Sequence, residues 1–102
     1  MRLHFENIRT AVVTGGAGGI GRHIALSLLQ VGCRVFVLDK DADSLDSLLS
    51  LAGSNATNLE RIEVDVAEPT KLTQVLHSIT RNAASVEALI CCAGYQEEAE
   101  LD

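Results

Sequence analysis

The chain has 102 residues, of which 47% are hydrophobic, and a formal net charge of −6; this length is enough for one compact domain. The acidic balance argues against a nucleic acid or an anionic membrane as partner, because both select for clustered lysine and arginine. With two phenylalanines, one tyrosine and no tryptophan, a base-stacking surface is not expected either.

Four apolar runs predict the strands of a sheet. Residues 11–13 and 35–38 are short continuous runs, typical of strands that are covered on both faces. Residues 61–66 alternate between apolar and polar side chains, which predicts a strand nearer to an edge of the sheet. Residues 88–93 form the fourth run.

Between these runs the apolar period becomes helical, which predicts three amphipathic helices. Their apolar stripes are Ile20, Ile24, Leu28 and Val31; then Leu45, Leu48, Leu49 and Ala52; then Leu72, Val75, Leu76 and Ile79. Asp41 and Asp43 favour the start of the second helix, and Pro69 suits the first turn of the third. Gly32 and Gly53 lie where the first two helices should end.

The alternation of strands and helices predicts an α/β fold with a Rossmann-like parallel sheet in the strand order 3-2-1-4. In that order the first two helices cover one face, and the third lies alone on the other. The fourth strand is then an open edge beside a partly uncovered face. We therefore expect the chain alone to be marginally stable or to self-associate as a homo-oligomer.

The connection between the first strand and the first helix is rich in glycine. Residues 14–21 read Thr-Gly-Gly-Ala-Gly-Gly-Ile-Gly, and Asp39 ends the second strand. Bare backbone amides at the start of a helix suit a pyrophosphate, and an acid at the end of the next strand can accept hydrogen bonds from the ribose hydroxyls. Arg22 and His23 follow the last glycine, so the lysine-containing P-loop is excluded. The pattern predicts a dinucleotide site.

Three motifs point to one family. Residues 14–21 fit Thr-Gly-x-x-x-Gly-Ile-Gly, residues 65–66 read Asp-Val, and residues 91–94 read Cys-Cys-Ala-Gly. Together they resemble the classical short-chain dehydrogenases/reductases, from about Thr10 to Gly94. The resemblance implies that the first motif is the cofactor signature, that the second contacts adenine, and that the third replaces Asn-Asn-Ala-Gly. Cysteine is a poor hydrogen-bond partner, so we expect a backbone contact from Cys91.

The glycines also fit a second pattern. Gly15, Gly18 and Gly21 match Thr-Gly-x-x-Gly-x-x-Gly, the motif of the extended branch, which includes nucleotide-sugar epimerases and dehydratases. The Ala93-Gly94 pair after the fourth strand favours the classical branch.

We expect residues 1–102 to form one NAD(P)-binding half-domain with no catalytic part and no metal site. The expected cofactor-binding residues are Gly15, Gly16, Ala17, Gly18, Gly19, Ile20, Gly21, Asp39, Lys40, Asp65, Val66, Cys91, Ala93 and Gly94. The three cysteines, at positions 33, 91 and 92, lack metal-ligand spacing and are interpreted as small buried side chains in a reducing compartment. Without a signal peptide or a membrane-spanning run, the expected location is the cytoplasm.

Asp39 also predicts the choice of cofactor. Its carboxylate would face the 2′-phosphate of NADP, which places like charges in contact, so NAD is preferred over NADP. The family resemblance implies a basic residue at position 18 in NADP binders, and this chain has Gly18. Arg22 and Lys40 lie nearby in the sequence and could reduce this preference, but each is interpreted more simply as a solvated surface charge.

The catalytic Ser, Tyr and Lys that the resemblance implies lie beyond the fourth strand and have no counterpart here. Tyr95 has no lysine four residues later and is interpreted as a loop residue. The sequence therefore predicts the NAD-binding portion of an oxidoreductase that acts on an alcohol or carbonyl substrate by hydride transfer. A non-catalytic NAD-binding sensor or interaction module is the alternative, followed by a scaffold that binds nothing.

Overall fold

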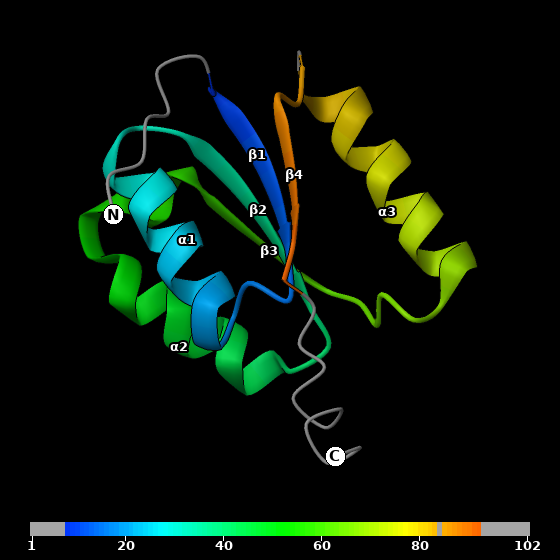
Figure 1. Ribbon diagram of the computed structural model, residues 1–102, viewed down its shortest axis with the longest axis horizontal. Coiled ribbons are helices and arrows are strands. Elements are labelled where there is room, and N and C mark those ends of the chain that lie inside the picture. The colour runs from blue at the N-terminus through cyan, green and yellow to red at the C-terminus, as the bar shows by residue number, and fades with distance from the viewer. Residues whose placement is uncertain (1–7, 84, 93–102) are drawn as a thin grey trace.

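Four parallel strands form the sheet at the centre of the molecule (Figure 1). They are β1 Thr10–Thr14, β2 Arg34–Asp39, β3 Leu59–Glu63 and β4 Ala88–Cys91. The computed structural model describes residues 8–83 and 85–92. Within these residues the strands follow the order β3-β2-β1-β4, which confirms the predicted order.

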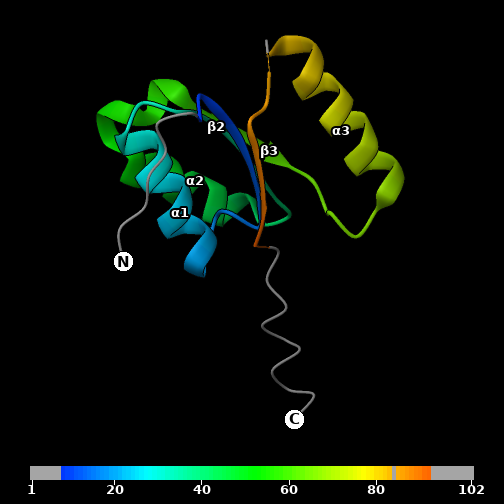
Figure 2. The same cartoon turned by 45° about the horizontal axis from the view of Figure 1, so that its top comes forward.

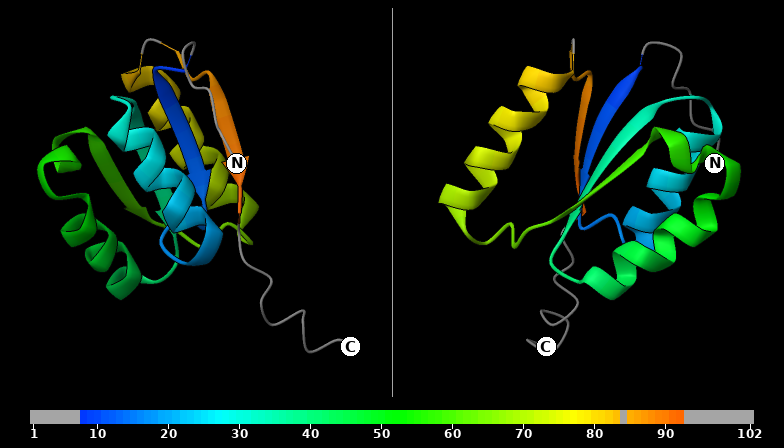
Figure 3. Two further views of the ribbon diagram at one scale, coloured as in Figure 1. Left: turned by 60° about the vertical axis from the view of Figure 1, so that its left-hand side comes forward. Right: turned by 180° about the vertical axis from the view of Figure 1, so that it is seen from behind.

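The helices divide between the two faces of the sheet. They are α1 Gly19–Gln30, α2 Ala42–Ala52, the short 3₁₀ helix η1 Gly53–Asn58, and α3 Pro69–Asn82. Figures 2 and 3 show α1 and α2 side by side on one face and α3 alone on the other. This arrangement confirms the predicted placement of the first two helices on one face and of the third on the other.

Each face of the sheet has its own core, because neighbouring residues of a strand point to opposite faces. Val13 and Val37 are fully buried against α1 and α2. Val12 and Phe36 are buried on the other face, in a smaller core that includes Ile79 of α3. The continuous apolar runs of β1 and β2 thus have the expected cause, which is cover on both faces.

The predicted apolar stripe of α1 is confirmed at Leu28, which is fully buried, and at Ile24, which packs partly buried against the larger core, but it is wrong at its two ends. Ile20 is 74% exposed and Val31 is 61% exposed, although both belonged to the expected stripe. The residues of α1 that are buried are Gly21, Ala25, Leu28 and Leu29. The first turn of the helix packs on the preceding loop through Gly21, which has no side chain, and this contact sets the face of the helix that is buried.

The expected stripes of α2 and α3 are confirmed. Leu45, Leu48 and Ala52 of α2 are buried. In α3 Ile79 is buried, and Leu72, Val75 and Leu76 pack partly buried beside it.

The third strand lies earlier in the chain than the alternation predicted. It spans Leu59–Glu63 instead of residues 61–66, and the pairing with β2 runs from Val35–Leu59 to Asp39–Glu63. The Val64 N–H donates to the Asp39 carbonyl at 2.9 Å, which ends the ladder. Asp65 and Val66 therefore lie in the connection to α3, where the strand prediction was wrong. The edge position of the strand is confirmed.

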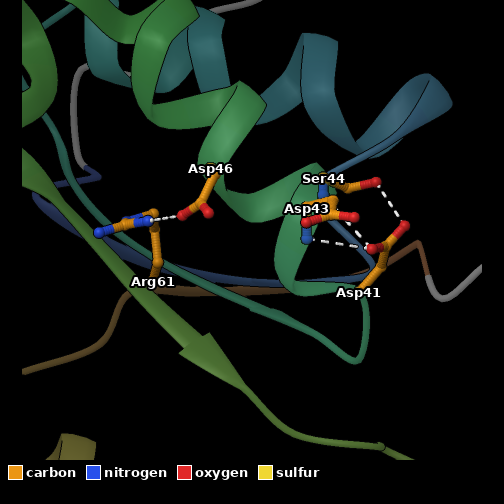
Figure 4. A network of polar contacts seen from close by, with 5 residues as sticks. All are labelled: Asp41, Asp43, Ser44, Asp46 and Arg61. Atoms are coloured by element: carbon orange, nitrogen blue, oxygen red, sulfur yellow. Dashed lines mark hydrogen bonds and ion pairs between the residues drawn. The ribbon is translucent and has the colours of Figure 1, made fainter.

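Polar contacts cap the start of α2 and join α2 to β3 (Figure 4). Asp41 caps α2, since one carboxylate oxygen accepts from the Asp43 N–H at 3.1 Å and the other from the Ser44 Oγ at 2.7 Å. The Ser44 hydroxyl and the backbone N–H groups lower the pKa of Asp41. Arg61 of β3 donates to Asp46 of α2 at 2.6 Å. The predicted cap is confirmed, as are Pro69 at the start of α3 and glycines after α1 and α2.

Glu87 holds the amino-terminal ends of β1 and β4 together. One carboxylate oxygen accepts from the N–H groups of Arg9 at 2.9 Å and Thr10 at 2.8 Å, and the other accepts from the Ser85 hydroxyl. These hydrogen bonds, led by the one from Ser85, lower the pKa of Glu87 to about 2. The carboxylate joins the start of β1 to the start of β4, a contact that no sequence pattern indicated.

The strand β4 pairs with β1, and within the part of the chain described it has no second partner. Ala88 and Ile90 pack against the larger core, whereas Leu89 is 56% exposed on the face that α3 only partly covers. The predicted open edge is therefore present in residues 8–83 and 85–92. No helix in those residues is both long enough and apolar enough to span a lipid bilayer.

Candidate functional site

The carboxyl ends of the parallel strands meet at one edge of the sheet (Figure 1). The glycine loop follows β1, and the Gly15 N–H donates to the Leu38 carbonyl at 2.7 Å. The Cys92 N–H, just after β4, donates to the Thr14 carbonyl at 2.8 Å. The order β3-β2-β1-β4 reverses direction at β1, and the crevice beside such a point is where open α/β sheets bind ligands.

The backbone of the loop requires glycine at three positions. Gly15 and Gly19 have φ angles of +69° and +57°, a region that strains other residues. A Cβ on Gly21 would lie 2.4 Å from the Gly15 carbonyl oxygen. At Gly18 the φ angle is −142° and no atom lies within 4 Å of an added Cβ, so other residues fit there. This requirement matches the classical spacing rather than the extended one.

The base of the loop packs on the larger core. A Cβ on Gly16 would lie 2.8 Å from the Val13 Cγ1 and 3.0 Å from the Val37 Cγ1. The next residue, Ala17, is fully buried. The base of the loop is therefore in close contact with side chains of β1 and β2.

Asp39 lies beside this loop. Its Oδ2 accepts from the Ala17 N–H at 3.3 Å, and its Oδ1 accepts from the Asp41 N–H at 3.0 Å. The carboxylate is half-buried, and Lys40 after it is exposed. The structure thus brings the acid and the glycine loop together, as the sequence spacing predicted.

Arg22 also contacts the loop. Its Nε donates to the Ala17 carbonyl at 3.1 Å, and the side chain is half-buried. The interpretation of Arg22 as a solvated surface charge is therefore wrong. A hydrogen bond from a side chain to a backbone carbonyl cannot be predicted from residue types. The position of Arg22 in the first turn of α1 was the one feature of the sequence that pointed to this contact.

Asp65 and Val66 lie farther along the same edge. Asp65 accepts from the Ala67 N–H at 2.9 Å through its carboxylate and from the Glu68 N–H at 2.9 Å through its carbonyl. No hydrogen bond in residues 8–83 and 85–92 joins Asp65 to the glycine loop. Val66 packs partly buried against the smaller core.

The cysteines differ from one another. Cys33 is buried and its thiol donates to the Ile8 carbonyl at 3.0 Å. Cys92 is half-buried, and burial raises the pKa of its thiol, with a smaller contribution from Cys91. Cys91 is exposed, so its interpretation as a buried side chain is wrong: it lies at the open edge. No group of three metal-binding side chains occurs in the described segments. Ala93, Gly94 and Tyr95 lie outside them.

Several known proteins are similar to this chain in sequence or in fold. The family model described as short chain dehydrogenase matches residues 9–102. UDP-glucose 4-epimerase 1 of Oryza sativa is 43% identical over 97 residues, which cover 91% of this chain and 26% of the epimerase. A short chain dehydrogenase/reductase of Macrophomina phaseolina is 34% identical over 83 residues, which cover 80% of this chain and 47% of that protein.

Among solved structures, the Pseudomonas aeruginosa RhlG/NADP complex superposes with a TM-score of 0.74 at 27% identity, covering 89% of this chain and 36% of that one. This chain thus spans less than half the length of each of these three proteins.

The contact between Gly21 and Gly15 gives a test of the loop geometry. We expect Gly21→Ala to lower the free energy of unfolding by about 1–3 kcal/mol, because the added Cβ displaces backbone atoms in a packed turn. The matched control Gly18→Ala, which has open space, should change it by less than about 0.5 kcal/mol. Urea unfolding followed by circular dichroism measures both. Equal effects of the two substitutions would contradict the described turn.

Proposed function

Since the chain belongs to the short chain dehydrogenase family, we propose that it is the NAD-binding portion of an oxidoreductase that acts on an alcohol or carbonyl substrate. The observation that carries this proposal is the hydrogen bond from the Ala17 N–H to the Asp39 carboxylate at 3.3 Å. It joins a glycine loop suited to phosphate to an acid suited to ribose at the switch point of the sheet.

The loop fits a dinucleotide. Nothing lies within 4 Å of the positions that side chains of Gly18 and Gly19 would occupy, so a ligand can approach the backbone there closely. The start of α1 supplies the positive end of a helix dipole for the pyrophosphate. The proposed binding residues are Gly15, Gly16, Ala17, Gly18, Gly19, Ile20, Gly21, Asp39, Lys40, Asp65, Val66, Cys91, Ala93 and Gly94.

This chain's own contribution is to bind and orient. The loop holds the phosphates, and Asp39 fixes the adenosine ribose through its carboxylate. When bound, the nicotinamide ring supplies the hydride chemistry. We place the groups that polarise the substrate oxygen outside these 102 residues, in keeping with the greater length of the relatives. A non-catalytic NAD-binding module would use the same site and stays an alternative.

A second candidate is the cofactor half of a nucleotide-sugar epimerase. The 43% identity to the rice UDP-glucose 4-epimerase favours it. The loop favours the oxidoreductase, because glycine is required at position 19 and not at position 18. Turnover of UDP-glucose by the native full-length protein, without net change of its bound cofactor, would make the epimerase the better assignment.

We propose NAD as the preferred cofactor, because the Asp39 carboxylate would repel a 2′-phosphate. Asp39→Ala should weaken NAD binding by about tenfold to a hundredfold, since a charge-assisted hydrogen bond is worth about 1.5–3 kcal/mol, and should weaken NADP binding less. Asp43→Ala, which removes the same charge from the exposed first turn of α2, is the matched control.

Calorimetric titration of each variant with both cofactors measures the preference. Tighter binding of NADP than of NAD by the unaltered chain would refute the assignment, as would an unchanged preference in Asp39→Ala.

We further propose that the chain self-associates through the open edge of β4, where Leu89 is 56% exposed. Sedimentation of the chain at micromolar concentrations should give a concentration-dependent mass, which Leu89→Lys reduces toward 10.9 kDa. Leu51→Lys is the control, because Leu51 is 55% exposed on α2, away from this edge. A monomer at every concentration, or equal effects of both variants, would contradict the proposal.

A cytoplasmic location stays a prediction.

A further inference from the structure

Two opposite charges hold the same residue of the glycine loop. The N–H of Ala17 donates to the Asp39 carboxylate at 3.3 Å, and its carbonyl accepts from the Arg22 Nε at 3.1 Å. Asp39 comes from the end of β2 and Arg22 from the first turns of α1. Ala17 itself is fully buried, whereas Asp39 and Arg22 are each half-buried.

The hydrogen bond to Ala17 uses only the Nε of Arg22. No other hydrogen bond or ion pair within residues 8–83 and 85–92 uses the two terminal nitrogens of this guanidinium, and none joins Arg22 to Asp39. A guanidinium held at one nitrogen retains a planar pair of donors that matches a phosphate. The site therefore contains an acceptor for ribose hydroxyls and a donor for phosphate at the same part of the loop.

We propose that Arg22 is a specificity-determining residue that pairs with the 2′-phosphate of NADP and thereby offsets the repulsion by Asp39. This inference rests on the proposed dinucleotide binding. Asp39 then favours NAD over NADP, and Arg22 reduces the difference in affinity between the two cofactors, so that the site can bind both. Lys40 is a weaker candidate because its exposed side chain has no hydrogen bond to the loop in the described part.

The test compares ligands that differ only in one phosphate. Arg22→Gln should weaken binding of NADP and of 2′,5′-ADP by about tenfold, with binding of NAD and 5′-ADP changed by less than about twofold. Arg22→Lys keeps the positive charge but not the planar pair of donors. It should therefore weaken binding of NADP and 2′,5′-ADP less than Arg22→Gln does. Arg81→Gln, which removes a positive charge from the last turn of α3 on the other face, should leave all four affinities unchanged.

Thermal unfolding of each variant is measured beside the titrations, so that loss of the fold is recognised directly. The loss for NADP should shrink at high salt, because the interaction is electrostatic and half-exposed. Equal weakening of NAD and NADP in Arg22→Gln would overturn the inference and reduce Arg22 to a support of the loop. Failure of the unaltered chain to bind NAD would instead overturn the proposed function itself.

Discussion

The close contact of Gly21 with the backbone of Gly15 is the constraint on which the rest of the site depends. A Cβ at position 21 would lie 2.4 Å from the Gly15 carbonyl oxygen, so only glycine lets α1 start directly against the end of β1. With the helix this close, Ala25 and Leu28 are buried on the sheet below it. The same turn leaves open space beside the backbone of Gly18 and Gly19, and a close approach to the backbone is what phosphate binding needs.

The polar side chains at the two ends of the sheet make different contacts. At the carboxyl end, Asp39 and Arg22 reach Ala17 from neighbouring elements, because β2 pairs with β1 and α1 follows β1 directly. At the amino end, Glu87 accepts hydrogen bonds from the first residues of β1 and fixes it to β4. At the amino end the polar side chain holds two strands together. At the carboxyl end the polar side chains contact the glycine loop.

Much of the fold follows from side-chain periodicity, and its errors have physical causes. The runs of β1 and β2 and the stripe of α2 were predictable because apolar residues carry the signal. The buried face of α1 was predictable only in part, because Gly21 packs against the loop by lacking a side chain and gives no hydrophobic signal. The position of Asp39 followed from motif spacing, whereas the contact of Arg22 depends on a backbone carbonyl that no residue pattern encodes. Cys91 was misjudged because the exposure of β4 depends on strand pairing.

The most direct test of the account is an NMR titration of the uniformly ¹⁵N-labelled chain with NAD. If the glycine loop and Asp39 form the dinucleotide site, amide resonances of residues 15–21 and of Asp41, whose N–H donates to Asp39, should shift in a saturable way. Those of Arg9 and Thr10, held by Glu87 at the opposite end of the sheet, should stay in place. Saturable shifts at Arg9 and Thr10 without shifts in the loop, or no shifts at millimolar NAD, would contradict the assignment.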